Sequence, residues 1–247
     1  MNFAKTMKVQ TVKHTLQIIE ALIEGDGESS VAALARQLGI ERLTVWRIVQ
    51  DLCEAGYLQR TGYRTVAPGF GLIYLGRQVS SQKFIPPFIR RELMKAQKTL
   101  GVKCALGSIV HNRVVYLFRT SDIEEIESAT SLPIHASNLA LCVLVSEKGV
   151  QKTLDFLRAS VENSDYSQEE KEKWNQNIKE RAEMLLAHGY AIHADTIGCN
   201  ISFPLKIRGM NFGLSFYDLP LQLPNKNYLI TQCSILRSRL ADYLNTH

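Results

Sequence analysis

Two short amphipathic segments meet at a glycine near the N-terminus. In the first, apolar residues recur at i, i+3, i+4 and i+7, the spacing that lines one face of a helix: Val31, Leu34, Ala35 and Leu38. The second repeats the spacing with Val45, Ile48, Val49 and Leu52. Gly39 lies between them and readily takes the left-handed backbone conformation at which a helix stops. The pattern predicts two helices joined by a tight turn.

Three residues of this stretch have the spacing of a helix-turn-helix. Small Ala35 marks the point where the helices cross, Gly39 supplies the turn, and β-branched Val45 anchors the second helix. An ordinary helical hairpin in a small bundle shares these features and is the alternative interpretation.

The flanking segments favour a DNA-binding domain. An apolar stripe predicts a preceding helix that covers the pair, with Val12, Leu16, Ile19 and Ile23. After Gly56, two short strands are predicted at Tyr57 to Arg60 and Tyr63 to Val66, around the two-residue turn Thr61-Gly62. Three helices followed by a hairpin predict a winged helix-turn-helix domain over residues 1–68.

A second domain follows a linker. The segment from Pro68-Gly69 to Pro86-Pro87 predicts a linker helix over 69–87, because proline pairs stop helices and mark junctions. Beyond it, hairpins around His111-Asn112 and Arg208-Gly209 alternate with helices, which indicates an α+β domain with one central antiparallel sheet over 88–247. The predicted helices are 88–100, 135–146, 147–159, 168–188 and 225–244, and the predicted strands are 103–110, 113–119, 190–193, 200–207 and 210–217.

Composition and charge refine this picture only slightly. Of the 247 residues, 45% are hydrophobic and 21% charged, as in ordinary globular proteins. We expect a cytoplasmic protein without membrane attachment, since neither a signal peptide nor a bilayer-spanning apolar run is evident. Five scattered cysteines without a CxxC pair are expected to be reduced thiols. Residues 1–84 hold ten Lys or Arg and seven Asp or Glu, so tight DNA binding would require two copies and well-placed arginines.

The whole chain resembles an IclR-type transcriptional regulator. Four segments carry the resemblance: the helix-turn-helix with RLTVWRIVQDLCEAGYL, the wing and linker YRTVAPGFGLIYLG, the segment LPIHASNLA, and the late block HGYAI…CNISFPLKIRGMNFGLSF. The resemblance implies an N-terminal winged helix, a C-terminal GAF-like effector-binding domain, and a homodimer or homotetramer. Two features depart from the family pattern. Ala140 and Leu141 stand where a glycine and a lysine are usual, and the loop from Tyr190 to Cys199 is shorter and lacks an acidic pair.

Helical geometry predicts the residues that contact DNA. A recognition helix places its exposed N-terminal part in the major groove, and here that part carries Arg42, Leu43, Thr44, Trp46 and Arg47. The arginines and the threonine can bond phosphates or base edges, and the two apolar residues can contact thymine methyls. On the predicted wing, Arg60 and Arg64 would meet phosphates. For each residue taken singly, the alternative is a solvated charge or a packing role.

The predicted effector site rests on the resemblance and on one physical feature. By resemblance it lies between the start of the helix near 136–140, the loop 193–199 and the strand 214–217. Residues 133–138 would form a helix N-terminus whose free N–H groups favour a carboxylate. The candidate contacts are Ser137, Asn138, Leu139, His193, Asp195, Cys199, Ser215 and Tyr217. We expect a small carboxylate-bearing metabolite that shifts the affinity for DNA, and Phe216 and Tyr217 hint at an aromatic acid.

Three alternative interpretations of the C-terminal residues and of the whole chain remain. Four residues have metal-binding side chains, but their spacing fits no compact zinc module, so no metal or other cofactor is predicted: His188, His193, Asp195 and Cys199. No known catalytic motif occurs, so the chain is not predicted to be an enzyme; an enzyme that carries a helix-turn-helix is the alternative. The third is a ligand-independent regulator. The predicted partners are a double-stranded DNA operator and a small-molecule effector.

Overall fold

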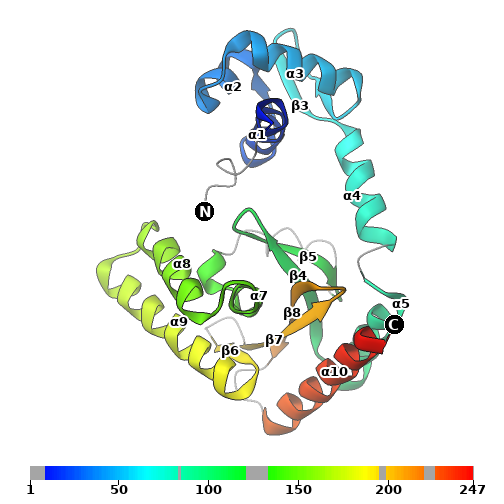
Figure 1. The fold of residues 1–247 in the computed structure, drawn as a ribbon, viewed down its shortest axis with the longest axis vertical. Coiled ribbons are helices and arrows are strands. Elements are labelled where there is room, and N and C mark those ends of the chain that lie inside the picture. Colours follow the sequence, from blue (N-terminus) through cyan, green and yellow to red (C-terminus); the bar gives the residue numbers. More distant parts are fainter. Residues whose placement is uncertain (1–8, 83–84, 121–132, 195–198, 220–225, 247) are drawn as a thin grey trace. The chain divides into compact units, whose positions relative to one another are not determined.

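A computed structural model of the chain describes residues 9–82, 85–120, 133–194, 199–219 and 226–246. The chain divides into two compact units, residues 1–84 and 85–247 (Figure 1). Within the described residues, no helix is both long and apolar enough to cross a membrane.

The N-terminal unit is a winged helix-turn-helix. Its elements are α1 (Gln10–Glu24), β1 (Ser29–Ser30), α2 (Val31–Leu38), α3 (Arg42–Glu54), β2 (Leu58–Arg60), β3 (Thr65–Pro68) and α4 (Phe70–Gln82). The three strands form a small antiparallel sheet in the order β1-β3-β2. The sequence pattern did not predict β1, because two serines carry no apolar alternation.

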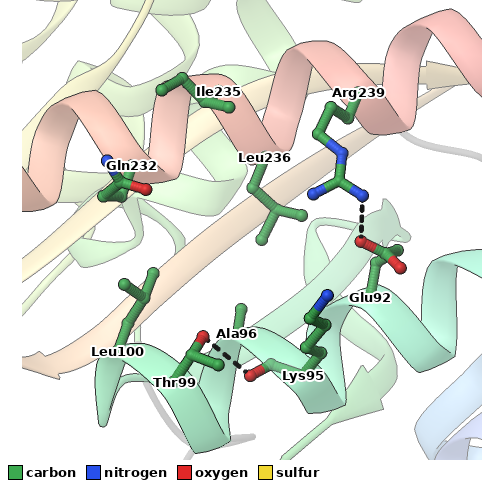
Figure 2. Close-up of a pocket in the computed structure, with 9 residues that line it drawn as sticks. All are labelled: Glu92, Lys95, Ala96, Thr99, Leu100, Gln232, Ile235, Leu236 and Arg239. Atoms are coloured by element: carbon green, nitrogen blue, oxygen red, sulfur yellow. Dashed lines mark hydrogen bonds and ion pairs between the residues drawn. The ribbon is translucent and has the colours of Figure 1, made fainter.

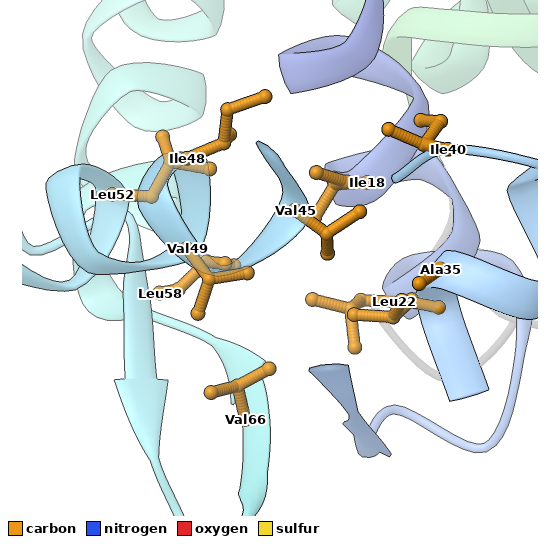
Figure 3. Packing of buried hydrophobic residues seen from close by; sticks show 11 residues of the cluster. Ile18, Leu22, Ala35, Ile40, Val45, Ile48, Val49, Leu52, Leu58 and Val66 are labelled. Carbon is orange, nitrogen blue, oxygen red and sulfur yellow. The ribbon is translucent and has the colours of Figure 1, made fainter. Parts of the chain in front are cut away.

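The apolar stripes predicted for α2 and α3 meet in one core (Figure 3). The stripe predicted for the preceding helix was wrong, because Val12 and Ile23 are exposed and α1 turns Ile18 and Leu22 toward the core instead. Ile18 and Leu22 of α1 pack with Val45 and Val49 of α3, and Val66 of the wing closes the cluster. Gly39 has a φ of 64°, as predicted for the turn between α2 and α3. The helix-turn-helix interpretation of this stretch is therefore confirmed.

The predicted wing was partly wrong. The strands are β2 and β3, joined by residues 61–64, rather than Tyr63 to Val66 following a two-residue turn. Arg60 pairs with Val66, and the Thr61 N–H donates to the Thr65 carbonyl oxygen at 3.2 Å, which closes a longer connection. Hydrogen bonds from Thr65 and Thr61, which flank this connection, also lower the pKa of Glu28.

Two glycines dock the start of α4 against the turn that follows α3. The Gly69 N–H donates to the Tyr57 carbonyl oxygen at 2.8 Å, and the Gly71 N–H donates to the Gly56 carbonyl oxygen at 2.9 Å. A Cβ atom on either glycine would lie 2.6 Å from the Gly56 oxygen. The PGFG motif therefore attaches α4 closely to the helix-turn-helix.

The C-terminal unit is an α+β domain built on one antiparallel sheet, as predicted. Its elements are α5 (Pro87–Leu100), β4 (Lys103–Val110), β5 (Arg113–Arg119), the 3₁₀ turn η2 (Ile134–Ala136), α7 (Asn138–Lys148), α8 (Val150–Glu162), α9 (Gln168–His188), β6 (Ala191–Ala194), β7 (Cys199–Ile207), β8 (Met210–Leu219) and α10 (Lys226–Thr246). The strand order is β5-β4-β8-β7-β6. Both predicted hairpin turns are present, and each places two residues at positive φ: His111 and Asn112, and Arg208 and Gly209.

Helices cover both faces of this sheet. α7 packs against β4, β7 and β8, and α8 and α9 pack in turn on α7 (Figure 1). On the other face, α5 packs against β4 and α10 against β7. The helix predicted at 135–146 begins three residues later than expected, because Ser137 caps α7 by accepting the Ala140 N–H at 3.1 Å.

Candidate nucleic-acid interface and effector pocket

The exposed side of α3 presents four of the predicted DNA contacts. Arg42 and Arg47 are exposed, and so are two large apolar side chains, Leu43 at 49% and Trp46 at 46%. Thr44 is half-buried, and its hydroxyl donates to the Glu41 carboxylate at 3.1 Å. The opposite side of α3 is fully engaged in the core. Cations beside exposed apolar groups suit a surface that contacts both phosphates and base edges.

The wing arginines occupy two different places. Arg60 ends β2 and donates to the Gln50 side-chain oxygen of α3 at 2.8 Å, which ties wing to recognition helix. Arg64 lies in the connection 61–64, and its guanidinium is 5.5 Å from the ring centroid of Tyr63. Tyr63 is 92% exposed. Sequence reasoning missed Gln50 and Tyr63, although an aromatic residue within a polar turn is a visible signal.

In the C-terminal unit, a cavity of about 120 Å³ lies at the N-terminus of α7. It is lined by Ala105, Tyr116, Arg119, Ala136, Ser137, Asn138, Leu139, Asn200, Ser215 and Tyr217. The cavity thus brings together five of the predicted effector contacts: Ser137, Asn138, Leu139, Ser215 and Tyr217. It also contains Arg119, Tyr116 and Asn200, which the sequence reasoning missed.

A pair of glycines lets the start of α7 approach the sheet closely. Gly107 of β4 pairs with Gly213 of β8, and Leu139 lies against both. A Cβ atom on Gly213 would be 2.6 Å from the Leu139 Cγ and 2.7 Å from the Leu139 carbonyl oxygen. Because the N–H groups of a helix's first turn have no intrahelical acceptor, this packing sets a partly positive helix end at the cavity.

The buried guanidinium of Arg181 is hydrogen-bonded to the residues at the start of α7. Arg181 of α9 is only 2% exposed. Its guanidinium donates to the His135 carbonyl oxygen at 2.6 Å and to the Asn138 Oδ1 at 3.1 Å. Asn138 in turn donates from Nδ2 to the Asn200 Oδ1 at 2.7 Å. Burial lowers the pKa of Arg181 to about 10, which leaves it positively charged at neutral pH.

A second cation forms part of the cavity wall. The Arg119 guanidinium carbon lies 4.6 Å from the ring centroid of Tyr116 and 5.0 Å from that of Tyr217. Among the described residues that line the cavity, none is an Asp or Glu. Two arginines and a helix N-terminus make this region favourable for an anion.

Three predicted effector contacts are not among the described residues of this cavity. His193 stacks on Trp174 of α9 with ring centroids 5.8 Å apart, and both line a separate cavity of about 440 Å³. Cys199 is buried outside the cavity lining. Asp195 lies outside the residues that the structure describes.

His135 joins the polar interior of this domain to an aromatic cluster. Its Nδ1 is 3.0 Å from the Ser160 hydroxyl, and its ring meets Trp174 edge-on at 5.1 Å. Its buried Nε2 has no hydrogen-bond partner within the described part of the chain. Burial, together with the positive charge of Arg181, lowers the pKa of His135.

A cavity of about 100 Å³ lies between α5 and α10, where Arg239 pairs with the Glu92 carboxylate at 2.7 Å (Figure 2). No group of three or more His, Cys, Asp or Glu in the described segments is placed to hold a metal ion. The five cysteines are free thiols, and four of them are buried.

Comparison with known proteins agrees with this architecture. Residues 11–62 match the sequence model of the IclR helix-turn-helix domain. No curated protein matches the sequence. An IclR family transcriptional regulator from Brucella abortus is 15% identical, with a TM-score of 0.75 over 96% of this chain and 92% of its own.

Two other solved structures show the same likeness. An IclR homologue from Microbacterium hydrocarbonoxydans, complexed with 4-hydroxybenzoate, is 17% identical with a TM-score of 0.65, over 96% of this chain and 100% of its own. A transcriptional regulator of the same family from Alicyclobacillus acidocaldarius is 14% identical with a TM-score of 0.64, over 97% of this chain and 99% of its own. Identities this low show a shared fold alone. Together with the matched domain, they confirm the resemblance predicted from the sequence.

Proposed function

We propose that this chain is an IclR-type transcriptional regulator, on the basis of its helix-turn-helix domain and its fold. It binds a specific operator as a homo-oligomer. Its affinity for that operator changes when a small carboxylate binds in the cavity at the N-terminus of α7. The proposal places the protein in the cytoplasm, with DNA. It assigns no catalytic role to any residue.

The exposed face of α3 is the main support for the proposed DNA recognition. A recognition helix needs a rigid, buried face and an opposite face free to enter the major groove, and α3 has both. Arg47 and Trp46 lie on the exposed face, one able to bond a guanine or a phosphate and the other able to contact thymine methyls. The bond from Arg60 to Gln50 supports a wing that acts together with this helix.

The exposed side of α4 supports the proposal of two or more copies. Phe70 is 77% exposed and Tyr74 is 63% exposed, and Ile73 lies between them on the same helical face. The helix carries one charged residue, Arg77, among its 13 residues. An exposed apolar face of this kind is typical of protein association. Two DNA-binding domains related by a two-fold axis would bind half-sites spaced by about one turn of the DNA helix, roughly 10 base pairs, or a multiple of it.

The cavity at α7 supports control by a carboxylate. Its positive surroundings favour an anion, and its small volume favours a small molecule. The aromatic pair Tyr116 and Tyr217 makes an aromatic acid a natural candidate. The neighbour from M. hydrocarbonoxydans, which holds 4-hydroxybenzoate, is consistent with that choice.

Arg47→Ala tests the proposed DNA interface. Sequencing the genomic fragments that the purified protein retains would first identify the operator. We then expect Arg47→Ala to weaken binding about 10- to 100-fold in a gel-shift titration, because a good arginine contact to a base contributes about 1–3 kcal/mol. Arg158→Ala on α8 is the control and should bind as the wild type does. An Arg47→Ala protein that melts normally and binds with unchanged affinity would contradict the assignment.

A further inference from the structure

We infer that Gln50 is a positioning residue for DNA recognition: it reads no base itself and holds Arg60, so that α3 and the wing bind the operator as one unit. The inference rests on the proposed DNA-binding function. It adds to that function the role of a residue that lies outside the predicted DNA contacts.

Gln50 lies on the side of α3 that the proposal directs toward DNA. It follows Arg47 by three residues and Trp46 by four, the spacing that puts side chains on one side of a helix. Trp46 and Arg47 are exposed, and Gln50 is half-buried. A glutamine at such a place is suited to read an adenine, because its amide can accept from N6 and donate to N7 of the base.

The side-chain amide of Gln50 is bound to the wing instead. The Arg60 Nη2 donates to the Gln50 Oε1 at 2.8 Å. Because a guanidinium has only donors, its partner must be the amide oxygen, the same atom that an adenine N6 would need. Burial raises the pKa of the Cys53 thiol, and the positive charge of Arg60 partly offsets this rise, so the guanidinium also lies near the next turn of α3.

Holding Arg60 orients the tip of the wing. Arg60 is the last residue of β2 and pairs with Val66 of β3. Immediately beyond this pair, the Thr61 N–H donates to the Thr65 carbonyl oxygen at 3.2 Å. The connection that remains is short and carries Arg64. Because backbone bonds close the hairpin on both sides of this point, an orientation imposed on Arg60 extends to Arg64.

The bond to Gln50 leaves Arg60 able to bind a phosphate. A guanidinium has five N–H donors, and Gln50 engages one of its terminal nitrogens, so the other donors can meet a phosphate from this exposed position. A side chain that is already held loses less entropy when it binds than one that is free. Gln50 therefore increases affinity for DNA through Arg60, without contributing to the choice of base.

Gln50→Leu tests the inference, because leucine fills a similar space but offers no acceptor to Arg60. In a gel-shift titration with the operator identified for the wild type, we expect the affinity to fall about 3- to 10-fold. In an Arg60→Met background the same change should alter the affinity by less than about twofold, because the partner is already absent.

Base preference separates a positioning residue from a base reader. Titration of a set of operators with single base-pair changes should give the same order of preference for Gln50→Leu as for wild type. The loss of a base reader would instead relax the preference at one position by about tenfold or more. Gln59→Leu, the same change on the exposed preceding residue of β2, is the matched control and should bind within about twofold of wild type.

Three results with variants that melt as the wild type does would overturn the inference. They are an unchanged affinity of Gln50→Leu, independent losses for Gln50→Leu and Arg60→Met that add in the double variant, and a relaxed preference at one base position. Each of them leaves the proposed DNA-binding function intact. A wild type that retains no genomic fragment would contradict that function itself, and this inference with it.

Discussion

The two units of the chain bury different chemistry. In the described part of residues 1–84, every buried side chain is apolar, and the charged groups lie at the surface. The described part of residues 85–247 buries a set of polar and charged residues: Glu92, His135, Ser137, Asn138, Thr153, Arg181, His193, Ser202 and Ser215. Several of them surround the first turn of α7. Reading DNA requires an exposed face on a rigid apolar core, whereas holding a small ion requires polar groups inside the domain.

Removing the buried cation Arg181 should produce the largest difference in stability between the two units. Arg181→Ala leaves the His135 carbonyl oxygen and Asn138 without their donor, and each buried acceptor left unsatisfied costs about 1–3 kcal/mol. We expect the free energy of unfolding of the C-terminal unit to fall by about 3 kcal/mol or more. Urea unfolding followed by Trp174 fluorescence in a Trp46→Phe background would measure this unit specifically.

Lys179→Ala is the control for this experiment, because Lys179 lies on the same helix with half of its side chain exposed. Its long contact to Glu183, 3.9 Å, is that of a surface ion pair, so its loss should cost less than about 0.5 kcal/mol. Equal urea midpoints for Arg181→Ala and Lys179→Ala would show that the buried network contributes nothing to stability.

Two glycine-to-alanine changes should have opposite signs. Gly213→Ala forces a Cβ atom against Leu139 at the cavity, and we expect a loss of about 1–3 kcal/mol from overpacking. Gly76→Ala lies in α4, where a Cβ atom would meet nothing within 4 Å, and we expect a gain of about 0.5–1 kcal/mol. Thermal unfolding of both variants measures the difference. A Gly213→Ala protein with wild-type stability would mean that α7 can move away from the sheet at no cost.

The same contrast explains how much the sequence could predict. The faces of α2 and α3 were predictable because one side is buried and the other is not, so the apolar period of a helix is visible. In α7, the first seven residues, 138–144, are all buried. An all-round buried helix shows no such period, and its start was predicted three residues too early.

The cavity residues were harder to predict because they depend on topology. Arg181 lies in a charged run that resembles a solvated helix, and nothing in its neighbours marks it as buried. Tyr116 and Tyr217 are far apart in the sequence, and they meet Arg119 only because β5 and β8 flank β4. Ser137 and Ser215 were predicted through the family resemblance, whereas Arg119 lies outside the four segments that carry that resemblance.

The smallest expected effect is a pH dependence confined to the C-terminal unit. The pKa of His135 is lowered from its ordinary 6.5, so the folded domain favours the neutral imidazole. As the pH falls below 6.5, the unfolded chain binds a proton before the folded chain does, and the unfolded state gains stability. The contribution of His135 is therefore fully present above pH 6.5 and is lost as the pH falls through the lowered pKa.

His135→Gln tests this reasoning because the side-chain amide can still bond Ser160 but does not titrate in this range. The free energy of unfolding of the wild type should fall more steeply between pH 7.5 and 5 than that of the variant, with the two differing most at the acid end. If His135→Gln and wild type follow parallel curves, the neutral imidazole is not what the buried network requires, and the acid sensitivity of this unit must come from another group.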